Sequence, residues 1–442
     1  MTDVILSFDT EDFTSNEAAD AIYREAEILR EEGVKGCFCV VGLLAKQLEN
    51  WGRTDVLEAL KHHEIASHSY GHTLHPTINE YTDIEDFETA KAEVLRQETE
   101  AVQMIRHATG VEKMYAACPP GNQKSYVAMY AYADMGFPVY ADTYCDTVDG
   151  QGVYYCNIFN VSYTYGMERT FLTCGEAEIR ELLDELSKHN RVILYTHPNI
   201  CMFEEFWDAK NYCKQNLHEF GQWESCTPRP KEVTDKFYEN LRTVVRLLKE
   251  DKRFRITNYS ELAGELAREP ERVVTQSDIP GLYEAISENF YPVTKPCSLS
   301  ISDMFLACRD LLMGKTEHVC GKVYGFLDTP YAITEAVTLS ADDIKKSAKN
   351  IDVSGFLPTE IKVGETVIGP ADWLFGAMAV LCGEETVTLQ PGEQLPSLDA
   401  LPMTRDCSFK GQWMQSDEFE DQYLSHRLRL QAWTMRFLKK PN

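Results

Sequence analysis

The chain has 442 residues, of which 44% are apolar and 26% charged, so we expect a globular protein of two or three domains. A net charge of −27 argues against nucleic acid and anionic membranes as partners, and no apolar run is long enough to predict a membrane span. The N-terminus has no signal-peptide pattern and the 14 cysteines form no C-x-x-C framework, which predicts mostly reduced thiols in a cytoplasmic protein.

Strands and helices are predicted to alternate along the first part of the chain, beginning with a buried strand at 4–8 that runs into acidic residues. Further strands are predicted at 35–41, 64–67, 114–117, 138–141, 191–195 and 254–257, with a strand or hairpin at 152–162. Helices are predicted at 18–32, 55–62, 82–110, 127–135, 176–189, 232–250 and 260–268. This alternation is typical of an α/β barrel or a doubly wound sheet.

A charged, proline-bearing segment after residue 268 predicts a boundary between a domain at 1–268 and a smaller, mainly helical domain at 269–442. In the second domain, residues 301–314 resemble residues 370–383, and each stretch carries an Asp and a Gly 11 residues apart. We expect a twofold repeat of helices joined by hairpins, with no assigned role, and a final helix at 417–438.

Polar segments follow four of the predicted strands: 9–12, 68–72, 118–121 and 196–198. His68 and His72 are four residues apart, which is a metal-ligand spacing where the backbone is helical or tightly turned. Taken singly, such segments are often helix caps or structural histidines. Parallel strands of an α/β fold open on one face, however, so the ordered set of four predicts one site.

On these motifs the sequence resembles the nodulation-protein-B-type polysaccharide deacetylases, carbohydrate esterase family 4, over about residues 1–265. Residues 67–72 look like the family's H-[ST]-x-x-H metal motif, and residues 7–12 are similar to its T-F-D-D motif. Residues 117–121 are similar to its R-P-P-Y-G motif, and residues 194–198 to the motif that ends in the catalytic histidine. The resemblance implies a distorted (β/α)₇ barrel.

The resemblance also implies a metal site. His68 and His72 would bind a divalent metal ion, with zinc as the expected ion, and Asp9 would be the general base. Glu11 is the preferred third ligand, because Asp9 and Glu11 share one side of a strand. Asp12 remains an alternative, since the strand is ending there.

His197 would protonate the leaving amine, while the cation polarises the amide carbonyl and lowers the pKa of water. The backbone N–H of Gly121 lies where the family's motif supplies an oxyanion donor. Asp146, or Asp142 as the alternative, would hold the other ring nitrogen of His197.

The sequence departs from the family at Cys118, which stands where the family has an arginine beside the base. Asp9 therefore has another cationic partner, for which Arg169 and Lys124 qualify by charge, or it titrates at a higher pH. We expect Cys118 to be a buried thiol rather than a nucleophile.

Two further features have open roles. His75 precedes Pro76, which favours an extended backbone and a structural or substrate-facing histidine. The irregular, aromatic segment 199–230 predicts either a lid or sugar-stacking platform, or a packed excursion over the barrel.

Together these features predict a metal-dependent hydrolase that removes N-acetyl groups from an amino sugar or glycan. Its partner is a carbohydrate substrate, and a homo-oligomer is compatible with the sequence. One alternative is hydrolysis of a non-sugar C–N bond, such as that of a ureide. Another is a non-catalytic glycan-binding or assembly protein, for which the Cys118 departure would mark lost catalysis.

Overall fold

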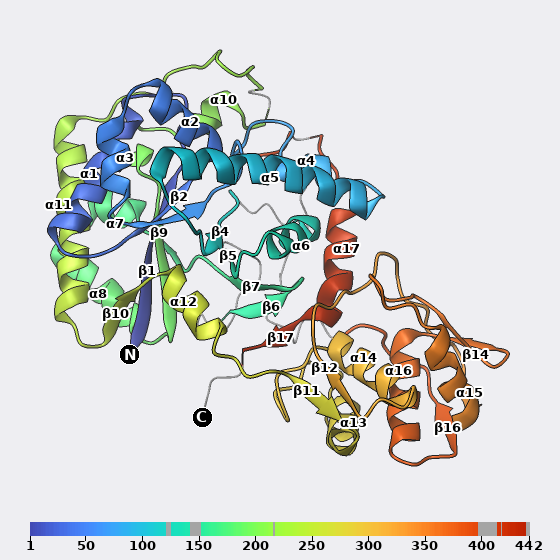
Figure 1. Cartoon of the computed structure of the whole chain (residues 1–442). Coiled ribbons are helices and arrows are strands. Elements are labelled where there is room, and N and C mark those ends of the chain that lie inside the picture. Colours follow the sequence, from blue (N-terminus) through green and yellow to red (C-terminus); the bar gives the residue numbers. More distant parts are fainter. Residues whose placement is uncertain (121–124, 142–151, 215–216, 397–412, 417, 439–442) are drawn as a thin grey trace. The chain divides into compact units, whose positions relative to one another are not determined.

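A computed structural model describes residues 1–120, 125–141, 152–214, 217–396, 413–416 and 418–438. The chain divides into two compact units (Figure 1). The first contains Met1–Gln151, Asn160–Ala267 and Ser408–Leu424, and the second contains Gly152–Phe159, Arg268–Cys407 and Ser425–Asn442. Each unit therefore takes segments from distant parts of the sequence, which a single boundary after residue 268 does not describe.

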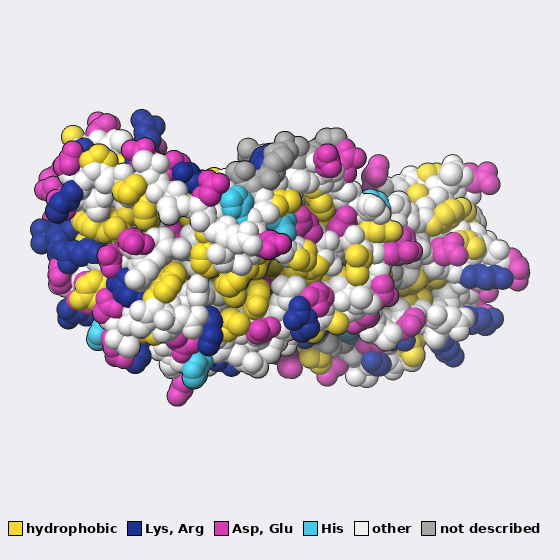
Figure 2. All heavy atoms as spheres, turned by 90° about the horizontal axis from the view of Figure 1, so that it is seen from above, with side chains coloured by type: hydrophobic (Ala, Val, Ile, Leu, Met, Phe, Trp, Pro, Cys, Tyr) yellow, Lys and Arg dark blue, Asp and Glu magenta, His cyan; other side chains and the backbone are white. Residues whose placement is uncertain are grey.

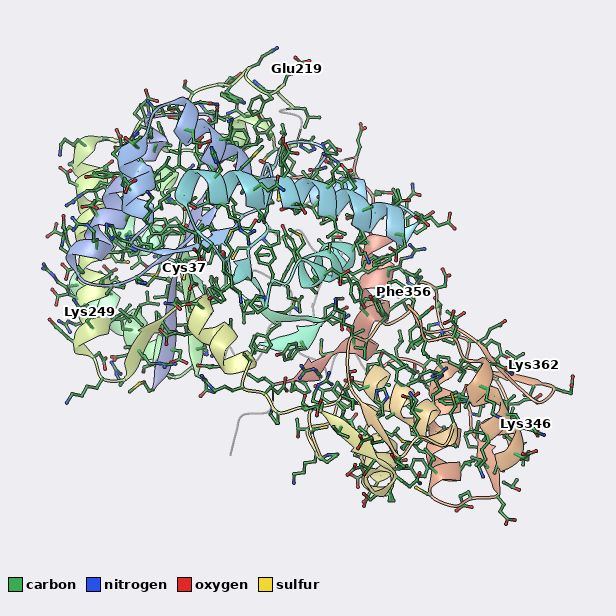
Figure 3. All side chains as sticks on the ribbon, in the orientation of Figure 1. Cys37, Glu219, Lys249, Lys346, Phe356 and Lys362 are labelled. Carbon is green, nitrogen blue, oxygen red and sulfur yellow. The ribbon has the colours of Figure 1, made fainter. Side chains whose placement is uncertain are left out.

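The first unit is built on a parallel sheet around the nine-residue strand β1 (Thr2–Thr10). Its first half pairs with β10 (Phe254–Thr257), its second half with β2 (Cys37–Val40), and its other edge with β9 (Arg191–Thr196). Cys37, labelled in Figure 3, is fully buried in β2, because both faces of this sheet are covered. The α/β class predicted from the sequence is confirmed.

The sheet continues in parallel from β2 through three more short strands. These are β3 (Glu64–Ser67), β4 (Ala116–Ala117) and β5 (Val139–Ala141). On the other side, β8 (Tyr165–Gly166) pairs in parallel with β9. The strand order β4-β3-β2-β1-β9 places the carboxyl ends of these strands at one edge of the sheet.

Helices alternate with these strands. The first six are α1 (Ala18–Glu31), α2 (Gly42–Asn50), α3 (Thr54–Leu60), α4 (Ile78–Thr82), α5 (Phe87–Thr109) and α6 (Tyr126–Asp134). The next six are α7 (Glu168–Thr173), α8 (Glu176–Leu186), α9 (Asn199–Met202), α10 (Trp207–Asn211), α11 (Lys231–Glu250) and α12 (Tyr259–Leu266). In Figure 1, α1 packs against α3 and α11, and α5 packs against α2 and α6.

Local sequence explains where the long helix α5 begins and ends. The Asp86 carboxylate accepts a hydrogen bond from Thr89 N at 2.8 Å, and Gly110 follows the helix with φ 73°. The helix predicted at 82–110 corresponds to α5, which begins five residues later, at Phe87, and the short helix α4 before it was not predicted. Helix α2 was not predicted from the sequence.

The predicted hairpin at 152–162 consists of β6 (Val153–Tyr155) and β7 (Ile158–Val161). Its two turn residues, Cys156 and Asn157, have φ values of 50° and 65°. Positive φ at both central residues is what a tight hairpin turn with the native strand twist requires.

The second unit contains the two stretches for which a twofold repeat is predicted. The pair β11 (Val273–Thr275) and β12 (Glu317–Val319) flanks α13 (Ile279–Glu288) and α14 (Ile301–Leu312). The pair β13 (Val337–Ser340) and β16 (Thr386–Leu389) flanks α15 (Ala341–Ser347), β14 (Ile361–Val363), β15 (Thr366–Ile368) and α16 (Pro370–Leu381). Helices α14 and α16 pack together in a core that includes Trp373 and Phe305, with ring centroids 4.8 Å apart.

The helix predicted at 417–438 is wrong in its extent. Helix α17 covers only Leu424–Leu430, and a 3₁₀ turn then leads into β17 (Arg436–Phe437), which pairs with β6. The Arg436 guanidinium lies 3.5 Å from the ring centroid of Tyr154 and 2.7 Å from Glu269. These tertiary contacts favour the strand over continued helix. Among the described residues, no helix has both the length and the apolar character of a membrane span.

Candidate metal centre and active site

The polar segments that follow the parallel strands lie at one edge of the sheet. Asp9 is the penultimate residue of β1 and Glu11 comes directly after this strand. His68 follows β3 and His197 follows β9. All four side chains line one pocket of about 540 Å³. The strand ends therefore bring these four side chains together, as expected from the sequence.

The segment that carries His68 and His72 is a tight turn and not a helix. Ser69 and His72 have φ values of 70° and 56°, a region that residues other than glycine rarely adopt. The Ser69 hydroxyl accepts a hydrogen bond from His72 N at 3.1 Å and supports this turn. The imidazole rings of His68 and His72 lie 5.1 Å apart. Backbone strain of this kind is typical of functional sites.

Glu11, His68 and His72 form a group whose ligand atoms all lie within 4.8 Å of one another. Glu11 Oε2 is 2.8 Å from His72 Nε2 and 3.4 Å from His68 Nε2. Within the described part of the chain, neither Glu11 Oε2 nor either ring nitrogen of His68 has a hydrogen-bond partner. Buried polar atoms normally have partners, and two imidazoles with one carboxylate are a zinc-type ligand set. These three residues therefore fit a divalent ion.

The two candidates for the third ligand, Glu11 and Asp12, differ in their pKa and in their hydrogen bonds. Burial alone would raise the pKa of Glu11, but the charges of His72 and His197 bring it well below its usual value. Asp12 Oδ1 accepts hydrogen bonds from both N and Oγ1 of Thr14, at 2.9 and 2.7 Å, and burial raises its pKa to about 7. The geometry favours Glu11, the preferred ligand of the sequence analysis.

Asp9 is held by a tyrosine. The Tyr163 hydroxyl donates a hydrogen bond to Asp9 Oδ1 at 2.8 Å, and His197 Nε2 lies 3.5 Å from Oδ2. Burial raises the pKa of Asp9 to about 8. Arg169 is exposed and makes no ion pair with Asp9 in the described structure, and Lys124 lies outside the described residues. Of the two expectations for Asp9, the higher pKa is the one that this geometry favours.

His197 lies between two carboxylates. Its Nδ1 is 2.7 Å from Glu168 Oε1, and Glu168 begins α7. Burial alone would lower the pKa of His197, but the surrounding carboxylates of Glu11, Glu168 and Asp9 raise it to about 10. Glu168 occupies the place that the sequence analysis gave to Asp146 or Asp142, both of which lie outside the described residues. No motif in the sequence marked Glu168.

Cys118 is fully buried, and its backbone N–H donates to the carbonyl oxygen of Ser67 at 2.7 Å. Burial raises the pKa of the Cys118 thiol well above its usual value. This environment favours a thiol over a nucleophilic thiolate, in agreement with the expectation for this residue. Gly121, the expected oxyanion donor, lies outside the described residues.

His75 is a structural residue. Its Nδ1 lies 2.8 Å from Glu80, and its Nε2 lies 2.7 Å from the carbonyl oxygen of Tyr212. These contacts connect the histidine turn to helix α4 and to the segment 199–230. They support the structural alternative for His75.

The sequence analysis missed two residues of segment 199–230 that reach the metal group. Trp207 Nε1 donates a hydrogen bond to Glu11 Oε1 at 3.1 Å, and Asp208 Oδ2 lies 3.4 Å from His72 Nδ1. Burial raises the pKa of Asp208 well above its usual value. Both residues belong to α10, a helix too short to give a periodic signal in the sequence.

The pocket also has aromatic walls. Besides the polar residues of the site, it is lined by Tyr163, Tyr195, Phe206 and Trp413. Trp413 is 39% exposed, and its ring centroid lies 6.3 Å from that of His72. A concave site with apolar walls and a few convergent polar groups is the usual form of a small-molecule site.

Comparisons with solved structures give distant likenesses. A putative polysaccharide deacetylase from Mycobacterium smegmatis is 16% identical, with 60% of this chain and 90% of that chain covered and a TM-score of 0.40. A probable polysaccharide deacetylase from Pseudomonas aeruginosa PAO1 is 12% identical, with 60% and 90% covered and a TM-score of 0.39. BA3943 from Bacillus anthracis, described as a pseudoenzyme of carbohydrate esterase family 4, is 16% identical, with 59% and 64% covered and a TM-score of 0.36.

The chain thus spans less than two thirds of the length of the Bacillus protein, and these likenesses are too distant to transfer an activity. No match was found among curated proteins. The sequence model of the polysaccharide deacetylase family, however, matches residues 2–140. This range contains Asp9, Glu11, His68 and His72, and it ends before His197. Residues 2–140 therefore match the polysaccharide deacetylase family, the one that the four motifs resemble.

Proposed function

We propose that the first unit is a metal-dependent hydrolase that removes N-acetyl groups from an amino sugar or glycan. One observation supports this most strongly: a zinc-type ligand group and a carboxylate–imidazole pair line the same pocket. Hydrolysis of an amide needs a base for water and an acid for the leaving amine, and Asp9 and His197 can supply these.

Glu11, His68 and His72 would hold the divalent ion, for which zinc is our expectation. When bound there, such an ion polarises the carbonyl of the scissile amide and lowers the pKa of water. All three residues line the pocket, so an ion that they hold would face the space that is open to the substrate.

Asp9 would accept the proton of the attacking water, with the hydrogen bond from Tyr163 fixing the orientation of its carboxylate. His197 would protonate the leaving nitrogen through Nε2, because Glu168 occupies Nδ1 and the pKa of the ring, about 10, keeps it charged at neutral pH. Gly121 as oxyanion donor remains a proposal from the sequence, while Glu168, in place of Asp146 or Asp142, would support the other ring nitrogen of His197.

The substrate would be a carbohydrate. Aromatic walls of the pocket offer flat apolar surfaces for the faces of sugar rings, and no Lys or Arg side chain lines the pocket in the described structure. This lining favours a neutral ligand over an anionic one.

The test offers two substrates to the zinc-loaded protein: N-acetylglucosamine oligomers and a cyclic ureide. We expect acetate release from the oligomers and no ring opening of the ureide, with acetate release lost in His197→Ala. Ring opening of the ureide without acetate release from the oligomers would show that the substrate is a ureide and not an N-acetylated sugar. If neither reaction occurs while the ion is bound, the result would favour the alternative of a non-catalytic glycan-binding protein over an enzyme.

A further inference from the structure

The segment 199–230 buries two residues against the metal-ligand group. Its tip is exposed, as Glu219 in Figure 3 illustrates, but Trp207 and Asp208 of α10 are both fully buried. Carboxylates are rarely fully buried unless they are paired, so the burial of Asp208 in a short helix requires an explanation. The contacts of these two side chains give a reason for their burial.

The Trp207 indole holds one oxygen of Glu11. Its N–H donates to Glu11 Oε1 at 3.1 Å, while the other oxygen, Oε2, lies 2.8 Å from His72 Nε2. A carboxylate with one oxygen held by a rigid donor has its other oxygen fixed in direction. In this chain that direction is toward the two histidines.

Asp208 holds the far side of His72. Its Oδ2 lies 3.4 Å from His72 Nδ1, and in the described structure neither oxygen of Asp208 accepts a hydrogen bond. The Thr73 hydroxyl lies 3.3 Å from the same nitrogen, but it brings no charge. Metal-ligating histidines commonly donate their second ring N–H to a carboxylate, which fixes the ring and makes it a stronger ligand. The place of Asp208 beside Nδ1, at an ion-pair distance, accounts for the burial of a carboxylate that has no hydrogen-bond partner among the described residues.

Helix α10 is itself held firmly. The Asn211 side chain donates to the carbonyl oxygens of Trp207 and Glu224, at 2.7 and 3.1 Å. The ring of Phe13, which follows β1 closely, lies 4.7 Å from that of Trp207 and 5.9 Å from that of Tyr212. A support is useful to a metal site only if it is rigid, and these contacts satisfy that condition.

We propose that Trp207 and Asp208 are positioning residues of the metal site: Trp207 orients Glu11 and Asp208 orients His72. The segment 199–230 then sets the affinity for the ion, rather than only covering the barrel. This inference rests on the proposed function, because it requires an ion at Glu11, His68 and His72.

The test measures the affinity of the full chain for Zn²⁺ by competition with a chromophoric chelator. It also measures the absorption spectrum of the protein loaded with Co²⁺. The variants are Trp207→Phe, which keeps an aromatic ring but removes the N–H, and Asp208→Asn, which keeps the shape but removes the charge. Matched controls in the same segment are Trp223→Phe, whose N–H donates to Tyr212, and Glu205→Gln, which contacts Thr227.

We expect each test variant to bind Zn²⁺ about 10- to 100-fold more weakly and to change the Co²⁺ spectrum, with both controls close to wild type. The melting temperature of the metal-free protein separates this effect from misfolding, since a lost support weakens binding in a chain that still folds. Wild-type affinity and spectra in both test variants would refute the inference and leave the proposed function intact. A wild-type chain that binds no Zn²⁺ would refute both.

Discussion

Asp9, the proposed base, has an unusual environment for a carboxylate that must ionise. The resemblance places an arginine where this chain has Cys118, and the Cys118 thiol is buried and uncharged. In place of an arginine, the Tyr163 hydroxyl donates to one oxygen of Asp9, and the charged ring of His197 faces the other. A hydrogen bond to the charged form favours ionisation, as a cation does, but burial opposes it and prevails in the metal-free chain.

The role of Glu168 leads to a prediction on kcat. In Glu168→Gln, His197 loses the negative charge at Nδ1 that helps to raise its pKa, and the ring is held less firmly. We expect kcat to fall about 10- to 100-fold at neutral pH. KM should change little, because Glu168 does not line the pocket in the described structure. Steady-state kinetics of acetate release measure both quantities.

Glu176→Gln is a matched control for this change, since Glu176 is exposed at the start of the neighbouring helix α8. It should have the kcat of the wild type. An unchanged kcat in Glu168→Gln would show that His197 does not depend on this carboxylate.

Residues of the site differ in how far the sequence could predict them. Asp9, Glu11, His68 and His197 could be found because each lies at or just after a buried strand, and parallel strands bring such positions together. His72 could be found from its spacing of four residues from His68. The supporting residues were missed, because each reaches the site from a turn or a short helix without any spacing rule: Tyr163, Glu168, Trp207 and Asp208. Their positions depend on tertiary packing.

Among the elements, the turn at 68–75 and the short segment at 413–416 shape the pocket. The turn carries two residues with positive φ, and the segment brings Trp413 from a distant part of the sequence to the wall beside His72. The first unit therefore depends on residues far from its main sequence range, which no boundary drawn along the chain would reveal.

Trp413 leads to a prediction at this scale. Its partly exposed ring is placed to pack on a sugar, so Trp413→Ala should raise KM for N-acetylglucosamine oligomers about tenfold, which corresponds to about 1.4 kcal/mol. The kcat should stay within about threefold of wild type, because the ring contacts no proton-transferring group. Tyr23→Ala, at an exposed position on α1, is the control. An unchanged KM would exclude Trp413 from substrate binding.

The second unit shows which elements are readable from sequence. The similarity of α14 and α16 could be predicted from the Asp and the Gly that the two stretches share. In the structure, the Asp near the start of each helix accepts a hydrogen bond from a backbone N–H before the helix, at 2.9 Å for Asp303 and 3.0 Å for Asp372. Gly314 and Gly383, with φ values of 90° and 106°, then follow these helices. These are local rules. The strand β17 was not predicted, because it depends on pairing with β6, some 280 residues earlier in the chain.

At the scale of the whole molecule, the distribution of charged side chains distinguishes between nucleic acids and neutral ligands as partners. The chain has 70 acidic and 43 basic residues, and Figure 2 shows the two kinds interspersed over the visible face, with no extended basic stripe. Nucleic-acid binding requires clustered positive charge, so this distribution agrees with a neutral ligand.

Stability of the fold should depend on pH through His63. Its Nδ1 accepts from Gly36 N at 3.2 Å and its Nε2 donates to the carbonyl oxygen of Ala26 at 2.9 Å, so the buried ring is neutral. Burial lowers its pKa to about 4 from an ordinary 6.5. Between these values the unfolded chain binds more protons, so the contribution of His63 to the free energy of unfolding increases with pH.

Urea unfolding of wild type and His63→Gln at several pH values measures this effect. The difference in free energy of unfolding, wild type minus variant, should increase by about 3 kcal/mol from pH 4 to pH 7. The comparison is needed because buried carboxyls with raised pKa, such as Glu98 at about 7, contribute with the opposite sign. A pH-independent difference would contradict the neutral, buried state of His63.

The central claim is that Glu11, His68 and His72 hold a divalent ion on which hydrolysis depends. The most direct measurement strips the protein with a chelator and follows acetate release from N-acetylglucosamine oligomers during titration with Zn²⁺. We expect no release without the ion, full activity near one equivalent per chain, and no recovery in His72→Ala or Glu11→Gln at that concentration. Acetate release by the stripped wild type, or recovery in both variants, would contradict the account.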